Sequence, residues 1–176
     1  SALTHIARLY ERGQIAQCGK YSLTTNAEIS EAASRYVPRA DWTIEYVSTW
    51  KNDLSGFFPI SLVNFAHFVY QPEFGNRADA FVKRFATGVG IEDWGEYTSP
   101  IKLIRDRIYE VQTQPGQLHR RERLALLIKA ANAFLLEKPL SSISYSKDAD
   151  TYPVPAIDPS EVKELRMESD YAWADN

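Results

Sequence analysis

The chain of 176 residues has a single cysteine, Cys18, and a single methionine. One cysteine cannot form an internal disulfide, and disulfides are characteristic of secreted proteins, so we expect a cytoplasmic protein. No apolar run reaches the roughly 20 residues that cross a bilayer. No basic stretch followed by an apolar segment marks a signal peptide. We therefore expect no membrane partner.

Clusters of residues that carry catalytic or metal chemistry are also missing. His5, His67 and His119 fall in separate predicted helices without the spacing of metal ligands. Cys18 lies in a predicted loop, and nothing near it marks an oxyanion hole. Asp148 and Asp150 can offer two carboxylates to a divalent cation, but the rest of a calcium loop is absent. We expect no catalytic residue, no metal and no cofactor.

The glycines of the stretch 87–90, Thr-Gly-Val-Gly, do not form a dinucleotide loop. Such a loop follows a strand, whereas this stretch follows a predicted helix, so Gly88 is expected to end that helix. Period-2 alternation of apolar residues is almost absent from the chain, which excludes an extensive β-sheet.

A long apolar run, residues 123–136, is the strongest signal that is present. Lys129 and Asn132 are its only polar residues between Arg123 and Leu136. A helix that is apolar nearly all round must be buried, so we expect a central helix from about Leu118 to Glu137. Four Trp, ten Tyr and eight Phe supply the volume of a core around it.

Helical spacing and capping residues predict further helices on both sides of the central one. They span residues 3–12, 25–36, 41–54, 59–70, 76–87 and 100–112, with a short acidic helix beginning near 158. We predict an all-α fold, a single domain of about seven or eight helices over residues 1–145. A Pro-containing strap and an acidic tail follow over residues 146–176.

Individual residues are expected to set these boundaries. Pro38 ends one helix, and Asp41, Asn76 and Ser99 cap the next ones. Gly56 is the predicted break after residue 54. The predicted core positions of these helices are Trp42, Val47, Trp50, Leu54, Phe65, Phe68, Tyr70, Phe81, Val82, Phe85, Ile101, Ile104, Ile108 and Val111.

Charge is unevenly distributed along the chain. Residues 102–138 hold eight basic and four acidic side chains, whereas residues 148–176 hold eight acidic and two basic ones. Such asymmetry is typical of a nucleic-acid patch or of an acidic interaction tail. The simpler interpretation is that the tail lies across the basic surface or is solvated.

Basic residues on two consecutive predicted helices define a candidate nucleic-acid surface. If the helices form a hairpin, these cations can follow a phosphate backbone. Its residues are Arg105, Arg107, Arg120, Arg121 and Arg123, with Lys129 further along. Asp106, Glu110 and Glu122 are interleaved with them and can pair with them instead.

Lys129 and Asn132 lie three residues apart and therefore on neighbouring positions of the central helix. One interpretation is that they contact a ligand. The simpler one is that the Asn132 amide bonds nearby backbone while the Lys129 stem extends to solvent.

Several core segments resemble a known family. They are Ala80-Phe81, Gly88–Ile91, Ser99–Ile101, Leu103–Arg105 and Lys129–Phe134. This order resembles the C-terminal helical region of phage and bacterial proteins whose N-terminal part is a ParB/sulfiredoxin-like domain. The family's Asp-Gly-Gln-His-Arg-type motif is absent from this chain, and Ala131 replaces an aromatic residue of its helical core.

The resemblance implies that the chain, which begins at Ser1 without a methionine, is the helical part of a longer protein. We expect a non-enzymatic accessory domain that serves assembly or partner recognition. Its partner would be another protein, the N-terminal domain of the full-length chain or a second copy. The alternative is a DNA-associated domain that uses the basic surface.

Overall fold

The computed structural model describes residues 34, 37–92, 94–113, 118–150 and 156–157. The predicted helix at 3–12, nearly all of that at 25–36 and the one near 158 fall outside these residues, as do Pro115-Gly116 and Tyr152–Pro155. Contacts divide the chain into two compact units, residues 1–69 and 70–176, and each is treated by itself. The predicted boundary at residue 145 stays a prediction.

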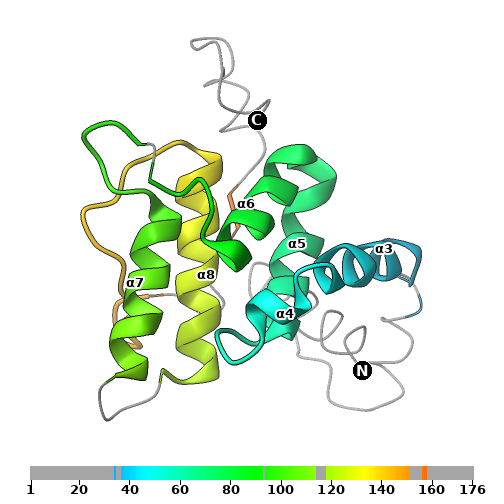
Figure 1. The fold of residues 1–176 in the computed structure, drawn as a ribbon, viewed down its shortest axis with the longest axis horizontal. Helices are drawn as coiled ribbons and strands as arrows, with labels where there is room; N and C mark the ends of the chain where they lie inside the picture. The colour runs from blue at the N-terminus through cyan, green and yellow to red at the C-terminus, as the bar shows by residue number, and fades with distance from the viewer. Residues whose placement is uncertain (1–33, 35–36, 93, 114–117, 151–155, 158–176) are drawn as a thin grey trace. The chain divides into compact units, whose positions relative to one another are not determined.

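The described residues form six helices and no strand, which confirms the mostly-α class (Figure 1). The helices are α3 (Val37–Ser48), α4 (Lys51–Leu54), α5 (Ile60–Phe74), α6 (Asn76–Thr87), α7 (Pro100–Gln112) and α8 (Arg120–Leu135). Within this part of the chain, no helix is both long and apolar enough to cross a membrane.

The start of α3 differs from the prediction. Asp41 lies inside α3 rather than capping it, so the capping role predicted for Asp41 is wrong. Pro38 also lies within α3, but the helix that it was predicted to end falls almost wholly outside the described residues, so its role stays a prediction.

The predicted helix over 41–54 is divided into two, because α3 ends at Ser48 and α4 begins at Lys51. Val47 and Leu54 are buried as predicted, whereas Trp50 is only partly buried. Trp42 retains 42% of its surface, so its predicted burial is wrong. Gly56 follows α4 with a positive φ of 72°, in line with the predicted break.

Helix α5 begins beside Pro59 as predicted but continues past Tyr70 to Phe74, through Pro72. Pro72 has no amide hydrogen, so the Phe68 carbonyl four residues earlier loses its intrahelical partner. The Arg39 guanidinium donates a hydrogen bond to this Phe68 carbonyl. The Arg39 side chain therefore supplies the hydrogen bond that the Phe68 carbonyl lacks because residue 72 is proline.

Helix α6 follows after one residue, Gly75, whose φ is +50°. Gly75 is the N-cap and Asn76 is the first helical residue, so the predicted capping role of Asn76 is wrong. The reason is that α5 extends to Phe74 and leaves a single residue for the turn. Gly88 ends α6 in the left-handed conformation, as predicted.

Helices α7 and α8 pack against each other, and both contact α6 (Figure 1). Ser99 caps α7 as predicted, accepting a hydrogen bond from the Ile101 amide at 3.3 Å. Val111 of α7 is only partly buried, unlike the three isoleucines of its stripe. The two helices that carry the basic residues therefore lie against each other, which is the arrangement that the candidate nucleic-acid surface requires.

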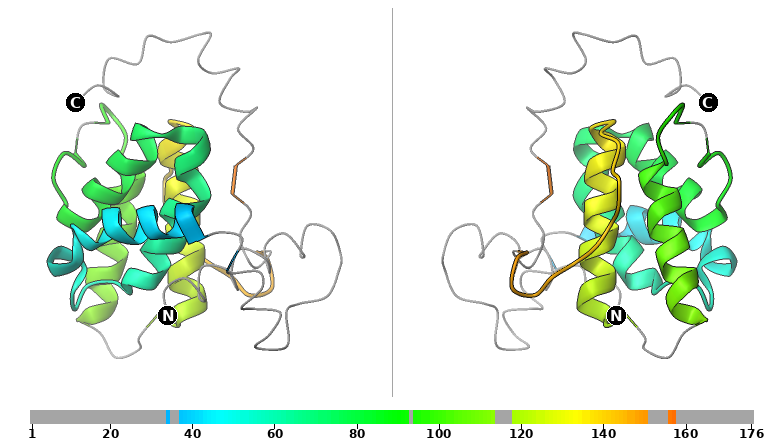
Figure 2. Two further views of the ribbon diagram at one scale, coloured as in Figure 1. Left: turned by 90° about the vertical axis from the view of Figure 1, so that its right-hand side faces the viewer. Right: turned by 90° about the vertical axis from the view of Figure 1, so that its left-hand side faces the viewer.

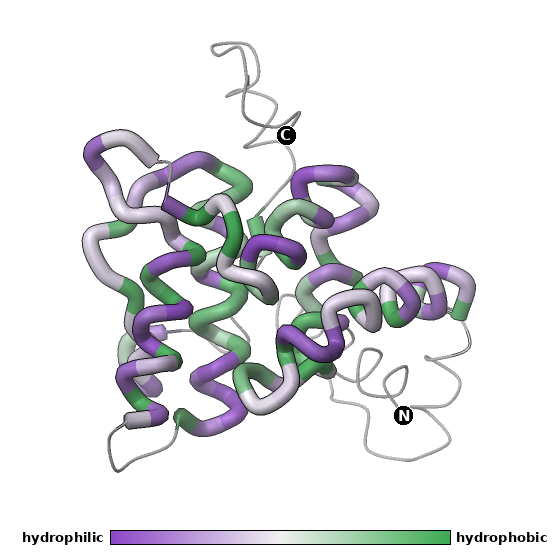
Figure 3. Tube along the Cα trace, in the orientation of Figure 1, coloured by the Kyte–Doolittle hydropathy of each residue, from purple (hydrophilic) through white to green (hydrophobic). Residues whose placement is uncertain are grey.

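The apolar helix predicted over 118–137 is α8, and its burial is confirmed. Ten of its residues are buried, and Phe134 is fully enclosed with its ring centroid 5.6 Å from that of Phe81. Figure 3 shows the hydrophilic colour gathered where α8 begins. The described residues that follow, from Lys138 to Asp150, form neither helix nor strand.

Candidate functional site

Arg105 of α7 turns toward α6 rather than toward solvent. Its Nη1 atom donates to the carbonyls of Phe85 and, at 3.1 Å, of Ala86, and its Nη2 atom lies 3.1 Å from the Tyr109 hydroxyl. The guanidinium also fits closely against Gly88, where an added Cβ would lie 2.9 Å from Nη2. Arg105 therefore caps the C-terminus of α6, whose carbonyls lack helical partners.

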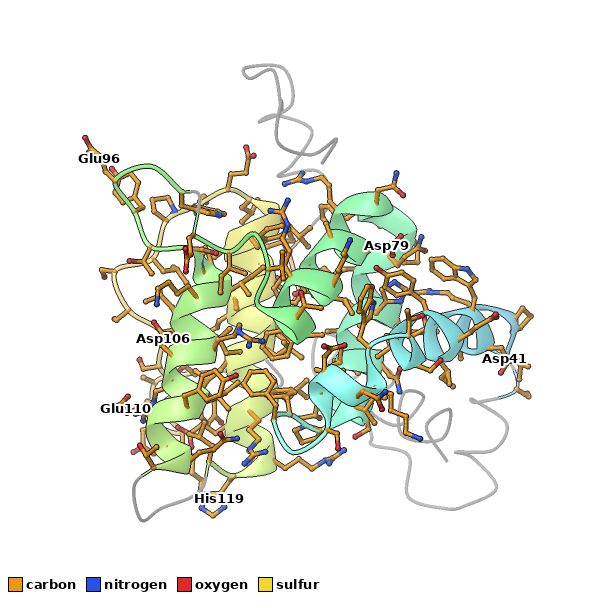
Figure 4. The ribbon with its side chains drawn as sticks, in the orientation of Figure 1. Asp41, Asp79, Glu96, Asp106, Glu110 and His119 are labelled. Carbon is orange, nitrogen blue, oxygen red and sulfur yellow. The ribbon has the colours of Figure 1, made fainter. Side chains whose placement is uncertain are left out.

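Arg107 of the basic surface, and Lys102 beside it on α7, have partners on their own helix. Arg107 forms an ion pair with Glu110 at 3.2 Å, and Lys102 forms one with Asp106 at 2.6 Å. Both carboxylates project from the outer face of α7, away from α8 (Figure 4). The interleaved acidic residues of α7 therefore lower the positive potential of that face.

Exposed members of the candidate nucleic-acid surface lie at the start of α8. Arg120 and Arg121 are exposed, and so is His119, the N-cap residue, which forms no side-chain cap (Figure 4). Arg123 is partly buried and donates from Nε to the Leu118 carbonyl at 3.1 Å. Of the five predicted arginines, this leaves Arg120 and Arg121 as the exposed pair.

Lys129 and Asn132 both contact the chain that follows α8. Lys129 Nζ donates to the Ser144 carbonyl at 2.8 Å and to Asp150 Oδ1 at 2.7 Å. Asn132 Oδ1 accepts a hydrogen bond from the Ile157 amide at 3.1 Å and another from the Tyr70 hydroxyl. Lys129 thus ends on a carboxylate instead of extending freely to solvent, while the Asn132 amide bonds backbone as the simpler interpretation proposed.

Asp150 is held from two sides. Oδ1 binds Lys129, and Oδ2 accepts a hydrogen bond from the Ser146 amide at 2.7 Å. The hydrogen bond from Lys129 and that from the Ser146 backbone lower the pKa of the Asp150 carboxyl. Burial raises the pKa of the Tyr70 phenol, which binds Asn132 of α8. The Tyr70 hydroxyl is therefore protonated at neutral pH and donates this hydrogen bond.

The histidines and aspartates that were considered as metal ligands do not form a cluster in the described part of the chain. No group of three or more His, Cys, Asp or Glu residues is arranged there to hold a metal ion. His67 is buried, and its Nδ1 atom lies 3.2 Å from the Thr43 hydroxyl. Asp150 is engaged with Lys129, and His5 and Cys18 lie outside the described residues.

An aromatic stack in unit 1 was missed by sequence reasoning. The Tyr46 and His67 rings are 4.7 Å apart and nearly parallel, and the Trp42 ring lies 5.2 Å from His67 and 6.1 Å from Tyr46. His67 is buried beneath the two side chains, while Trp42 is exposed. The spacing of four residues between Trp42 and Tyr46 was the available signal, because it places both on one helix face.

The aromatic stack and the Lys129–Asn132 pair are two arrangements of side chains within the described residues that sequence reasoning did not assign to a reaction. Neither is a catalytic geometry that defines a reaction. No protein-family model, curated protein or solved structure matches this chain.

Proposed function

We propose that this chain is a non-enzymatic helical interaction domain that serves assembly or partner recognition. In this proposal it is the accessory region of a larger phage or bacterial protein with a ParB/sulfiredoxin-like domain, as the segments Gly88–Ile91 and Lys129–Phe134 suggest by resemblance. The observation that carries the interaction role is the exposed Trp42, which stacks on Tyr46 and contacts the His67 ring at a tilt.

Trp42 has the properties of an interface anchor. Tryptophan is enriched among the residues that dominate binding energy at protein interfaces. Its contacts with Tyr46 and His67 hold the ring before a partner arrives, so binding loses less side-chain entropy. An exposed aromatic group that is already ordered is thus suited to contact an apolar surface of a protein partner or of a second copy.

The test replaces Trp42 and follows the mass of the chain as a function of concentration. We expect the wild-type chain to self-associate and Trp42→Ala to associate more weakly by about 1–2 kcal/mol, roughly 5- to 30-fold in Kd. Tyr97→Ala is the matched control, because Tyr97 is also exposed (59%) but lies in the loop before α7. A wild-type chain that is monomeric at all concentrations contradicts self-assembly through Trp42.

The alternative proposal is a DNA-associated domain, now centred on Arg120 and Arg121. Both are exposed at the N-terminus of α8, where the helix dipole also favours anions. Two phosphate contacts supply a weak, sequence-independent and salt-dependent interaction.

A further inference from the structure

After α8 the chain turns back and runs along the helix that it has just left (Figure 2). We call the described residues 138–150 and 156–157 the return segment. Lys129 holds it at Ser144 and Asp150, and Asn132 holds it at Ile157. The segment also buries Ile143, so it packs as well as bonds.

The connection between α8 and the return segment is strained. Glu137 has a φ of 55°, in the left-handed region that favours glycine. It closes a Schellman motif, in which the Lys138 amide donates to Ala133 and the Glu137 amide donates to Phe134. Pro139 follows directly. The turn that folds the segment back on its own helix is therefore short and conformationally costly.

The hydrogen bonds and the ion pair that hold the return segment on α8 can open. The α8 helix of a second copy offers the same Lys129 and Asn132 side chains, so the segment can form the same contacts there. The Lys129 and Asp150 side chains keep 28% and 23% of their surface, so water reaches the ion pair. Two of the three contacted groups, the Ser144 carbonyl and the Ile157 amide, are backbone atoms. A symmetric exchange forms every one of these contacts again, and short strained hinges favour such exchange.

We propose that the return segment is an exchangeable arm, which leaves its own α8 at Glu137 and binds Lys129 and Asn132 of a second copy. In the exchanged dimer the Lys129–Asp150 ion pair joins the two chains twice, and the chain around Glu137 is free to extend. The arm goes beyond the proposed interaction role of Trp42, because it lies in the other unit and uses different contacts.

A charge-reversal pair tests the exchange. In the Lys129→Glu variant, residues 129 and 150 are both negative, and in the Asp150→Lys variant both are positive. Each variant therefore repels the return segment of its own chain. Mixed in equal amounts, the two full-length variants can form one Lys129–Asp150 pair and one reversed pair, but only between chains. We expect a 1:1 heterodimer by native mass spectrometry and light scattering, with each variant alone no more associated than wild type.

The double variant Lys129→Glu/Asp150→Lys is the matched control, because it carries the same charges and restores attraction within one chain. We expect it to associate no more than wild type. Glu137→Gly in both mixed chains tests the hinge, since glycine adopts the left-handed turn without strain. It should weaken the heterodimer by roughly 10- to 30-fold, as about 1 kcal/mol of strain is removed at each of two hinges.

The outcomes separate this inference from the role of Trp42. Association through Trp42 appears in each variant alone, whereas exchange appears only in the mixture and persists when both chains carry Trp42→Ala. A mixture that stays monomeric while both variants melt as folded proteins overturns the proposal. If either variant does not fold alone, the two are refolded together. A folded heterodimer then supports exchange, and no folded product overturns it.

Discussion

Several arginines of this chain donate hydrogen bonds to backbone carbonyls that a helix leaves without a partner. Arg77 binds the carbonyl of Leu135, the last residue of α8, and Arg105 binds two carbonyls near the end of α6. Arg39 binds the Phe68 carbonyl opposite Pro72. A guanidinium offers five donors and a fixed positive charge, which suits it to the negative end of a helix dipole.

At this scale we predict that Arg39 and Pro72 are energetically coupled. Arg39→Ala should lower the free energy of unfolding by about 1–3 kcal/mol, because the buried Phe68 carbonyl loses its donor. In a Pro72→Ala background the same change should cost about 1 kcal/mol less, because the amide of residue 72 can then donate to Phe68. Urea unfolding of the four proteins of this double-mutant cycle measures the coupling.

Strict additivity of the two changes would show that Arg39 stabilises α5 in some other way. Its guanidinium carbon lies 3.9 Å from the centroid of the Phe68 ring, so a cation–π contact is the competing explanation. Phe68→Leu separates the two, because it removes the aromatic ring but keeps the backbone carbonyl that Arg39 binds.

At the scale of the element, the predicted helix boundaries were right where the residues at the helix end carry a local signal. The start of α7 was predicted because Ser99 and Pro100 carry the capping signal locally. The end of α5 was not, because Pro72 is tolerated only when a distant arginine replaces its missing bond. The end of α8 at Leu135 lies close to the predicted end at Glu137, because Pro139 cannot continue a helix. The left-handed turn at Glu137 has no local signal, since that position usually holds glycine.

We predict that the backbone at Glu137, more than its side chain, limits stability at this helix end. Glu137→Gly and Glu137→Ala both remove the carboxyl group, but only glycine adopts the left-handed conformation without strain. The glycine variant should be more stable than the alanine variant by about 1 kcal/mol, which thermal and urea unfolding can measure. Equal stability would mean that the turn relaxes when its side chain is removed.

At the scale of the whole molecule, the uneven charge of the sequence does not translate into an equally basic surface. Arg105 and Arg123 bind carbonyls, and Arg107 and Lys129 bind carboxylates. The charge count over residues 102–138 therefore overstates the positive potential that a phosphate backbone would meet.

If the alternative function holds, duplex DNA binding should be weak, should fall steeply with salt and should depend on the start of α8. Arg120→Glu/Arg121→Glu should remove it, or lower the slope of log K against log salt by about 2, one unit for each lost phosphate contact. Lys51→Glu/Lys147→Glu is the matched control, with the same change in charge at two exposed residues elsewhere. Fluorescence anisotropy across a salt series gives the result, and equal loss in both variants would indicate a non-specific effect of net charge.

The sequence by itself determined the helical class, the burial of α8 and the capping of α7, because apolar periodicity and capping residues act over a few neighbouring positions. Only the tertiary structure decided which polar side chains form ion pairs or hydrogen bonds with distant residues, and that the Trp42 side chain stays exposed. Lys129 meets Asp150 because the chain returns along α8, and Trp42 stays exposed while its ring contacts the stacked Tyr46 and His67 rings. Such pairings depend on how distant segments approach one another, and residue order alone carries little trace of that.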